Sequence, residues 1–351
     1  MRRMVVAGVL LVASSHVLAQ QGRFVWEDFS KRIGASRQIS PLGDDLFGDK
    51  VSLSNGALSF SIVDIDLPGN NALPVRFGRS YEVMNRRYYG NTGMLADWDV
   101  DVPSLSGVFA TDWLISPGTD QPGSANRCSA AGYPPVVKPF RLEDYFHGIK
   151  IDIPGSYSGT VLRKGRNVPS PAHGTTYRWV GNDGQTQLSC LPSIKNGAGE
   201  GFLAITPDGT RYWFDWMAQV YEPAAKTIDD FNNRPTPVFL EKRRNILYAT
   251  RVEDRHGNHV IYTYSNAWNA PGRLTSIQSS DGRALSIGWA GNFVGSVSDG
   301  VRTWTYSYGT TSSGRSTLTS VVQPDQSRWT IDFAPFTNAE LIFRDFVPGG
   351  E

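Results

Sequence analysis

The sequence predicts an all-β protein made largely of antiparallel hairpins, and three observations support this fold class. Aromatic residues make up 12% of the 351 residues, and Trp, Tyr and Phe favour the half-buried surfaces of sheets. The 36 glycines and 21 prolines are scattered along the chain, which is typical of short strands joined by turns. Between residues 201 and 335 one strand-turn-strand pattern recurs five times. We therefore expect stacked hairpin repeats preceded by an N-terminal β-domain.

Residues 1–19 have the features of a secretory signal peptide. Arg2 and Arg3 form a basic start, residues 5–12 form a short apolar core, and residues 17–19 (Val-Leu-Ala) match a cleavage site. The apolar core is too short to span a bilayer. We expect an exported mature chain without a transmembrane segment, located in the periplasm, at the cell surface or outside the cell. An uncleaved anchor or a buried helix is the alternative.

Four further regions follow the predicted signal peptide. Residues 20–45 are polar and irregular and are predicted to be a linker. Residues 46–200 are predicted to be an N-terminal β-rich region with long loops, because Pro-, Gly- and Ser-rich stretches interrupt its alternating segments. Residues 201–335 carry the hairpin repeats, and residues 336–351 are predicted to be a tail.

The charge balance bears on the class of partner. Without Arg2 and Arg3, the chain has 32 basic and 33 acidic residues, so the mature protein is nearly neutral. Binding to a nucleic-acid backbone relies on an excess of Lys and Arg. We therefore expect no nucleic-acid partner.

The first hairpin of the N-terminal region is predicted around Asn55-Gly56. Apolar residues alternate on both sides of this dipeptide, at Val51 and Leu53 before it and over residues 58–65 after it. Asn-Gly supplies the positive φ angles that a tight hairpin turn requires. Two antiparallel strands are therefore expected here.

Residues 97–102 alternate strictly between Asp and apolar side chains. In a strand this pattern places Trp98, Val100 and Val102 on the buried face and three carboxylates on the opposite face. The three carboxylates belong to Asp97, Asp99 and Asp101. Three carboxylates at this spacing are weak candidates for a Ca²⁺ site, and a solvated strand face is the interpretation that we favour. No other metal or cofactor is expected.

The chain has two cysteines, Cys128 and Cys190. In an exported protein a lone pair of cysteines often forms a disulfide, and we predict this bond. Two separate buried thiols are the alternative. A reactive cysteine is not expected, because neither residue has a basic neighbour that would stabilise a thiolate.

Each of the five repeats has an apolar strand, an Asp-Gly-type turn and an alternating strand that ends in an aromatic residue. Gly provides a positive φ angle in the turn, and Asp bonds to the local backbone. The turn residues of the first four repeats are Asp208, Gly209, Asp254, Gly257, Asn258, Asp281, Gly282, Asp299 and Gly300. In the fifth repeat Gln326 replaces the glycine. One hairpin is marginally stable alone, so the repeats should stack and bury their aromatic rows.

The repeats resemble those of the YD-repeat, or RHS-repeat, family. The matching segments are Val252–Tyr264 (VEDRHGNHVIYTY) and Gly272–Ile277 (GRLTSI). The segments Val51–Leu58, Asp64–Gly69 and Leu73–Tyr81 are similar to the region that precedes the repeats in such proteins. The resemblance covers roughly residues 46–105 and 201–333.

The resemblance implies a β-sheet that winds in a spiral. In long family members this sheet forms a hollow shell around a C-terminal toxin or other cargo. This chain has about five repeats, lacks the Asp-Pro-x-Gly-Leu cleavage motif and has no cargo domain before Glu351. We therefore expect a partial shell or a cell-surface interaction module, related to toxin-delivery proteins and without enzymatic activity. The partners expected on this basis are another RHS-repeat chain, a toxin cargo or a cell-surface glycan.

Two alternative functions follow from other residues. Carbohydrate or cell-wall binding would use exposed aromatic rings, and the weak candidates are Trp213, Trp216, Trp289 and Trp304. Glycoside hydrolysis would use a pair of carboxylates, such as Asp64/Asp66, Glu143/Asp144 or Asp229/Asp230. The common nucleophile and metalloenzyme motifs are missing from the sequence.

Overall fold

The computed structural model describes residues 48–51, 58–82, 93–118, 121–165, 177–229, 236–311 and 314–332. The predicted signal peptide, linker and tail, and the Asn55-Gly56 turn, lie outside these residues. No helix within the described ranges is long and apolar enough to cross a membrane.

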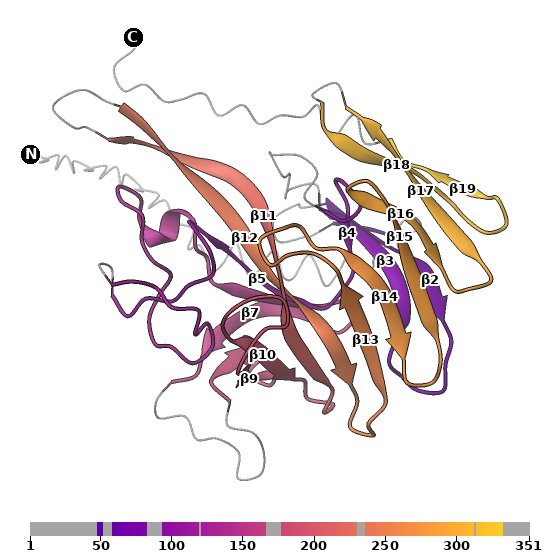
Figure 1. Ribbon diagram of the computed structural model, residues 1–351, viewed down its shortest axis with the longest axis horizontal. Coiled ribbons are helices and arrows are strands. Elements are labelled where there is room, and N and C mark those ends of the chain that lie inside the picture. The colour runs from indigo at the N-terminus through magenta and orange to yellow at the C-terminus, as the bar shows by residue number, and fades with distance from the viewer. Residues whose placement is uncertain are drawn as a thin grey trace, which may run out of the picture.

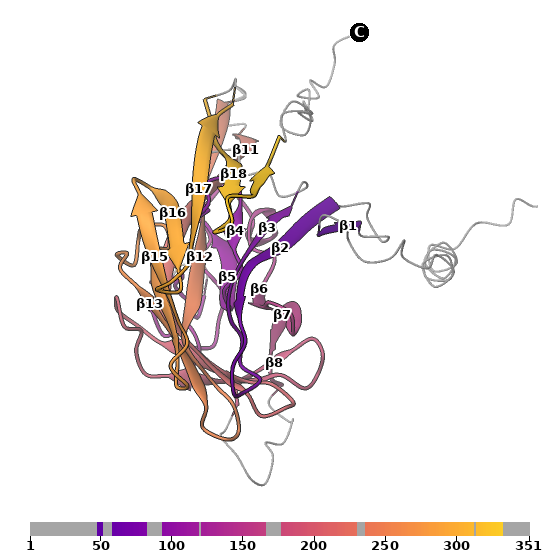
Figure 2. The same ribbon diagram turned by 90° about the vertical axis from the view of Figure 1, so that its right-hand side faces the viewer.

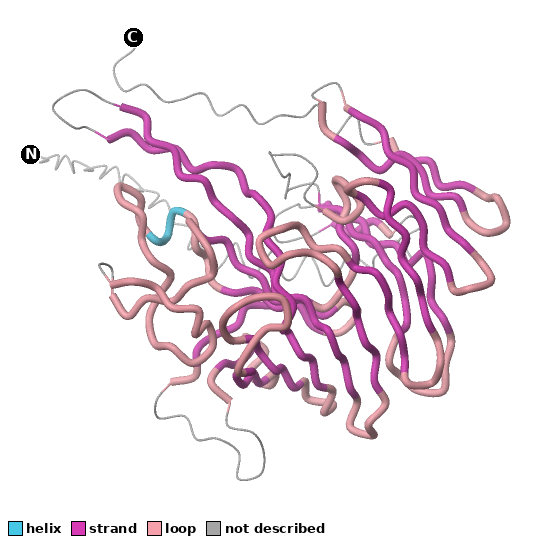
Figure 3. The backbone as a smooth tube through the Cα atoms, viewed as in Figure 1, coloured by secondary structure: helices cyan, strands magenta, loops and turns pink. Residues whose placement is uncertain are grey.

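The described chain is all-β, as predicted, with one short 3-10 turn, η1 (Leu142–Asp144), among its strands and loops (Figure 3). Its nineteen strands form two antiparallel sheets. The smaller sheet contains β1 (Asp49–Val51), β2 (Leu58–Leu67), β3 (Val75–Glu82) and β4 (Asp99–Val100). The larger sheet contains β5 (Ser104–Phe109), β6 (Ile149–Ile153), β7 (Tyr157–Arg163), β8 (Trp179–Gly181), β9 (Gln187–Leu191), β10 (Gly201–Ile205), β11 (Arg211–Asp229), β12 (Thr236–Glu253), β13 (His259–Tyr264), β14 (Leu274–Ser279), β15 (Ala284–Ala290), β16 (Phe293–Ser298), β17 (Thr303–Thr310), β18 (Ser316–Val322) and β19 (Arg328–Thr330).

Strands β5 to β12 close into a ring of eight antiparallel strands. Consecutive strands pair from β5 through to β12, and β12 pairs again with β5. The register of the closing pair places Ser106 opposite Ile246 and Leu105 opposite Leu247. Strands β9 and β10 pair, so the predicted boundary between residues 200 and 201 falls inside one sheet.

The hairpin repeats branch from the ring at β12. One edge of β12 pairs with β5 over residues 243–248 and with β13 over residues 251–253. Strands β13 to β19 then follow in chain order (Figure 1). All five predicted hairpins are present, as β10–β11, β12–β13, β14–β15, β16–β17 and β18–β19.

The aromatic rows of the repeats become a shared interior. Tyr262, Tyr264, Trp304 and Tyr306 are each at most 8% exposed. They belong to one apolar cluster that also contains residues of the ring and of the smaller sheet. This burial explains why the repeats need their neighbours, since an isolated hairpin would leave the same rings in water.

The smaller sheet packs against the ribbons and covers their aromatic face. Figure 2 shows β2 and β3 as one layer and β15 to β17 as another. The rings of Phe77 and Tyr306 meet across the two layers, with centroids 5.7 Å apart. Arg283, at a repeat turn, donates from Nη1 to the carbonyl of Leu67 at 2.8 Å. The two sheets therefore form a sandwich beside the ring.

The predicted disulfide is confirmed, because Cys128 and Cys190 are bonded. It ties the loop that contains Cys128 to strand β9. The carboxylate of Glu200 also holds this loop, accepting the backbone N–H groups of Cys128 at 3.1 Å and Ser129 at 2.8 Å. Cys128 is fully buried, so the bond is part of the core beside the ring.

The repeat turns have the predicted geometry. Gly209, Gly257, Gly282 and Gly300 have φ angles of +87° to +92°. In the fifth repeat Gln326 adopts a φ of +69°, where a side chain crowds the backbone. The pattern therefore keeps the turn conformation even where the glycine is missing.

Replacing Gln326 with Gly is expected to raise the free energy of unfolding by roughly 0.5–1 kcal/mol, because glycine removes the left-handed strain. The matched control is Gly300→Ala, which should lower stability by about 1 kcal/mol. No atom lies within 4 Å of the position of an added Cβ at Gly300, so the backbone alone causes this loss. Urea denaturation measures both changes. A destabilised Gln326→Gly protein would contradict the assignment of strain.

Candidate functional site

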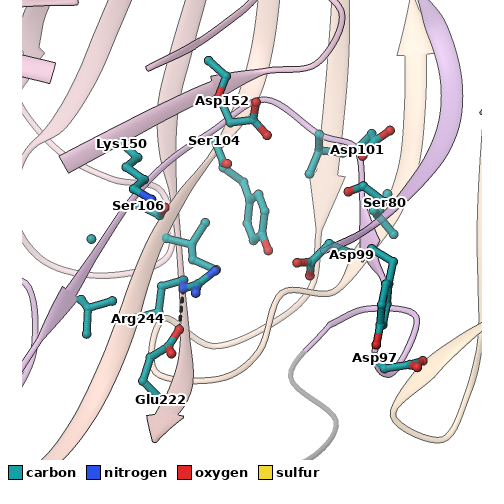
Figure 4. A pocket seen from close by; sticks show the side chains of 18 of the residues that line it. Ser80, Asp97, Asp99, Asp101, Ser104, Ser106, Lys150, Asp152, Glu222 and Arg244 are labelled. Atoms are coloured by element: carbon teal, nitrogen blue, oxygen red, sulfur yellow. Dashed lines mark ion pairs between the residues drawn. The ribbon is translucent and has the colours of Figure 1, made fainter. Parts of the chain in front are cut away.

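A polar cavity lies where the outer surface of the ring faces β4 and the β17–β18 ribbon. Its volume is about 480 Å³, within the range of roughly 300–1,000 Å³ typical of small-ligand sites. Strands β5, β6 and β12 form the floor, β4 and its flanking residues form one wall, and Thr311 with residues 315–317 form another. Figure 4 shows polar side chains pointing into this space.

The floor of the cavity is built in two cross-strand rows. Tyr248, Ser104 and Asp152 are register partners on β12, β5 and β6. Ile246, Ser106 and Lys150 form the adjacent row. Successive side chains of a strand point to opposite faces. The fully buried Leu105, Ile151 and Leu247 therefore fill the ring, while the polar residues face the cavity.

The acidic wall consists of Asp97, Asp99 and Asp101, on and beside β4. Asp97 accepts hydrogen bonds from Thr317 Oγ1 at 2.7 Å and from the backbone N–H of Leu318 at 2.8 Å. Burial raises the pKa of Asp97 and of Asp101 above the usual value of 3.8, and hydrogen bonds oppose this rise. Asp97 therefore also connects β18 to the region around β4.

These three carboxylates correct one expectation and leave another as a prediction. The apolar residues between them, Trp98, Val100 and Val102, are buried as predicted. The carboxylates are half-buried against the cavity, so the favoured interpretation of a solvated face is wrong. In the described part of the chain no three acidic, His or Cys side chains converge as a metal site would require. The weak Ca²⁺ candidate stays a prediction.

Two of the cations that line the cavity, Arg244 and Lys150, lie on the side opposite the acidic wall. Arg244 pairs with Glu222 across the β11–β12 ribbon, with Nε and Oε1 2.6 Å apart, and both side chains are largely buried. Lys150 extends from β6 and is exposed. Figure 4 shows Lys150 and Arg244 on one side and Asp97, Asp99 and Asp101 on the other. The cavity thus presents donors and acceptors from different directions.

The four tryptophans proposed for binding do not line this cavity. Trp216 stacks on Tyr264 and donates from Nε1 to Asn266 at 2.9 Å. The rings of the other three lie beneath arginine side chains. These pairs are Trp213 with Arg251, Trp289 with Arg273, and Trp304 with Arg302. Each ring is thus engaged locally, and their role in binding stays a prediction.

The carboxylate pairs considered for hydrolysis also lie elsewhere. Asp64 is buried against Arg79, with Nε and Oδ2 2.9 Å apart. Asp144 accepts the backbone N–H of Arg141 at the start of η1. Asp230 lies outside the described residues. None of the described members of these pairs lines the cavity.

The turn aspartates stabilise the hairpin ends. The pKa of Asp299 is lowered to about 2, mainly by the hydrogen bond that it accepts from the backbone N–H of Arg302. Asp254 accepts the backbone N–H groups of His256 and Asn258, at 2.8 and 3.0 Å. Asp281 also accepts the backbone N–H of Asn70 at 3.2 Å, so one turn contacts the smaller sheet. These contacts agree with a structural role for the turn residues.

The fold defines the class of protein: an antiparallel all-β chain in which a closed eight-stranded ring continues into a series of hairpins. No protein-family model and no curated protein matches the chain. Among solved structures, a chain of the Photorhabdus luminescens Tc holotoxin pore, determined with a TccC3 mutation, is distantly similar. The TM-score is 0.38 and the identity 11%, over 84% of this chain and 16% of that chain. This protein therefore matches about a sixth of the length of that chain.

Proposed function

We propose that this protein is a non-enzymatic, exported β-scaffold of RHS-repeat type that binds another chain at the open end of its sheet. The observation that carries the proposal is the position of β19. Within the described residues β19 pairs with β18 alone. An edge strand of this kind is a template for a further strand.

The backbone groups available at this edge follow from the register. Gln323 donates to the carbonyl of Ser327, and Ile331 donates to the carbonyl of Thr319, both at 2.8 Å. In an antiparallel pair the bonded residues alternate with residues whose N–H and C=O groups point away. Arg328 and Thr330 therefore present their backbone groups to the outer edge.

The partner that fits this edge is a chain with hairpins of the same kind. Every ribbon from β12 to β19 adds to the preceding one by antiparallel pairing, so a further ribbon would continue the same sheet. The resemblance of the repeats to the RHS family supports a partner that carries such repeats, or a cargo enclosed with them. Release of reducing sugar from a glycan would instead favour the hydrolase alternative.

A synthetic hairpin with the sequence of residues 272–289 is a suitable probe for the edge. We expect it to protect the amides of Arg328 and Thr330 from hydrogen exchange. Thr330→Pro should weaken binding by about tenfold or more, because proline lacks the outward donor. Thr330→Val keeps that donor and should bind like the unmodified protein. Calorimetry measures the affinities, and equal affinity of the Pro and Val variants would refute the proposal.

A further inference from the structure

We infer that the cavity between the ring, β4 and the β17–β18 ribbon is a binding site for an uncharged polyhydroxylated ligand, a short oligosaccharide. This inference is independent of the β19 edge and of the tryptophans considered above. It depends on the chemistry of the floor, the presence of both signs of charge around the cavity and the half-buried ring of Tyr248.

The floor offers hydrogen-bonding groups in a regular array. Ser104 and Ser106 on β5 lie between Tyr248 on β12 and the pair Lys150 and Asp152 on β6. Neighbouring strands are about 4.8 Å apart, similar to the separation of hydroxyl groups on opposite sides of one sugar ring. A serine hydroxyl both donates and accepts, a carboxylate accepts, and an ammonium group donates. A sugar hydroxyl can bind to all three.

The charges of the walls favour an uncharged ligand. Glu222 is paired with Arg244, and Asp97 is bonded to Thr317 and Leu318. A hydrogen bond from Ser80 acts on Asp101. Asp99 and Asp152 also line the cavity, as do the cations Lys150 and Arg315, so its lining carries charges of both signs. A polyanion or a polycation would therefore meet repulsion from one side of the cavity.

An aromatic residue completes the site. Tyr81, Tyr145 and Tyr248 line the cavity, and of these Tyr248 is half-buried while the other two are buried. The ring of Tyr248 is held by stacking on Tyr264, with centroids 5.3 Å apart and planes 18° apart. A rigid tyrosine provides contact area at low entropic cost, and the C–H face of a sugar packs on such a ring. The combination of small hydroxyl side chains, carboxylates and a tyrosine therefore matches a saccharide.

Saturation-transfer NMR and calorimetry on the full chain test the inference with a panel of neutral trisaccharides. The panel contains maltotriose, cellotriose, mannotriose, galactotriose and the N-acetylglucosamine trimer. We expect at least one to bind. Ser106→Leu, which projects a larger apolar side chain from the floor, should weaken this binding by about tenfold or more. Lys150→Met, at an exposed position, should weaken it by about fivefold.

Two control variants separate binding in the cavity from binding elsewhere on the protein. Ser286→Leu makes the same change on an exposed part of β15 away from the cavity, and should leave binding unchanged. Thr330→Pro should also leave sugar binding unchanged. The proposal for the β19 edge and the inference for the cavity can therefore be refuted independently. Raising the salt concentration from about 50 to about 500 mM should have little effect, because screening weakens mainly charge-driven binding.

Three results would overturn the inference. One is the absence of binding by every sugar in the panel. Another is sugar binding that neither Ser106→Leu nor Lys150→Met reduces, provided that circular dichroism shows both variants folded. The third is salt-sensitive binding of spermidine that Ser106→Leu abolishes, which would make the cavity a cation site.

Discussion

Replacing Arg79 with Met is expected to lower the free energy of unfolding by about 3–5 kcal/mol, because it leaves a buried carboxylate without its partner. The side chain of Arg79 is fully buried and that of Asp64 is 2% exposed. Arg79 Nε donates to Asp64 Oδ2 at 2.9 Å, and the Tyr306 hydroxyl donates to the same oxygen at 3.1 Å. The cluster thus joins β2 and β3 of the smaller sheet to β17 of the ribbons.

The double variant Arg79→Met/Asp64→Asn is the matched control for this effect. The Asn amide at position 64 is neutral and still accepts a hydrogen bond from Tyr306, so no unpaired charge stays buried. The double variant should therefore recover more than half of the lost stability. Denaturant titration at neutral pH measures both. A loss of less than about 1 kcal/mol in the free energy of unfolding for Arg79→Met would show that this ion pair contributes no more to stability than an ion pair on the surface.

The same pair predicts a pH dependence. Burial raises the pKa of Asp64 above 3.8, and the charge of Arg79 opposes the rise. Removing Arg79 should raise the folded-state pKa further above the unfolded value. The stability associated with a raised carboxyl pKa is present below the unfolded pKa and is lost as the pH rises through the folded pKa. Arg79→Met should therefore cost less stability near pH 4 than near pH 7.

Breaking the disulfide should also lower the stability of the protein strongly. Cys128 and Cys190 are 62 positions apart, and closing a loop of this length stabilises a protein by about 4 kcal/mol in the chain-entropy model. We expect Cys128→Ser/Cys190→Ser to lose a comparable amount in equilibrium unfolding. Reduction of the unmodified protein should give a similar loss. A loss under about 1 kcal/mol in both experiments would contradict a stabilising role for the bond.

The local part of the fold could be predicted from the sequence because the signals are local. An Asp-Gly dipeptide specifies a turn, and the alternation on either side specifies which residues are buried. Five hairpins, the burial of Trp98 and Val100, and the stacking of aromatic rows were predicted correctly on this basis. Even the Gln326 turn followed the pattern, because its flanking strands and backbone bonds outweigh the cost of a positive φ angle.

The closure of the ring could not be predicted, because it joins segments that are distant in the chain. Strand β5 pairs with β12 across more than a hundred residues, and no turn motif connects them. The cavity is a consequence of this closure. The alternation of β5 and β6 indicates a polar face, but the sequence does not show that this face lines a cavity. Its residues are Ser104, Ser106, Lys150 and Asp152. The half-burial of the three aspartates was missed for the same reason.

The pairing of β5 with β12 underlies both the cavity and the branching of the ribbons, and an engineered cross-link can test it. Ser106 and Ile246 are register partners, and in the alternation of this antiparallel pair they occupy a non-hydrogen-bonded position, where Cα atoms lie about 4.5 Å apart. A disulfide fits this geometry. Ser106→Cys/Ile246→Cys should form the bond in the folded protein, as shown by non-reducing peptide mapping. Free thiols at both positions, with the protein folded, would contradict the closed ring.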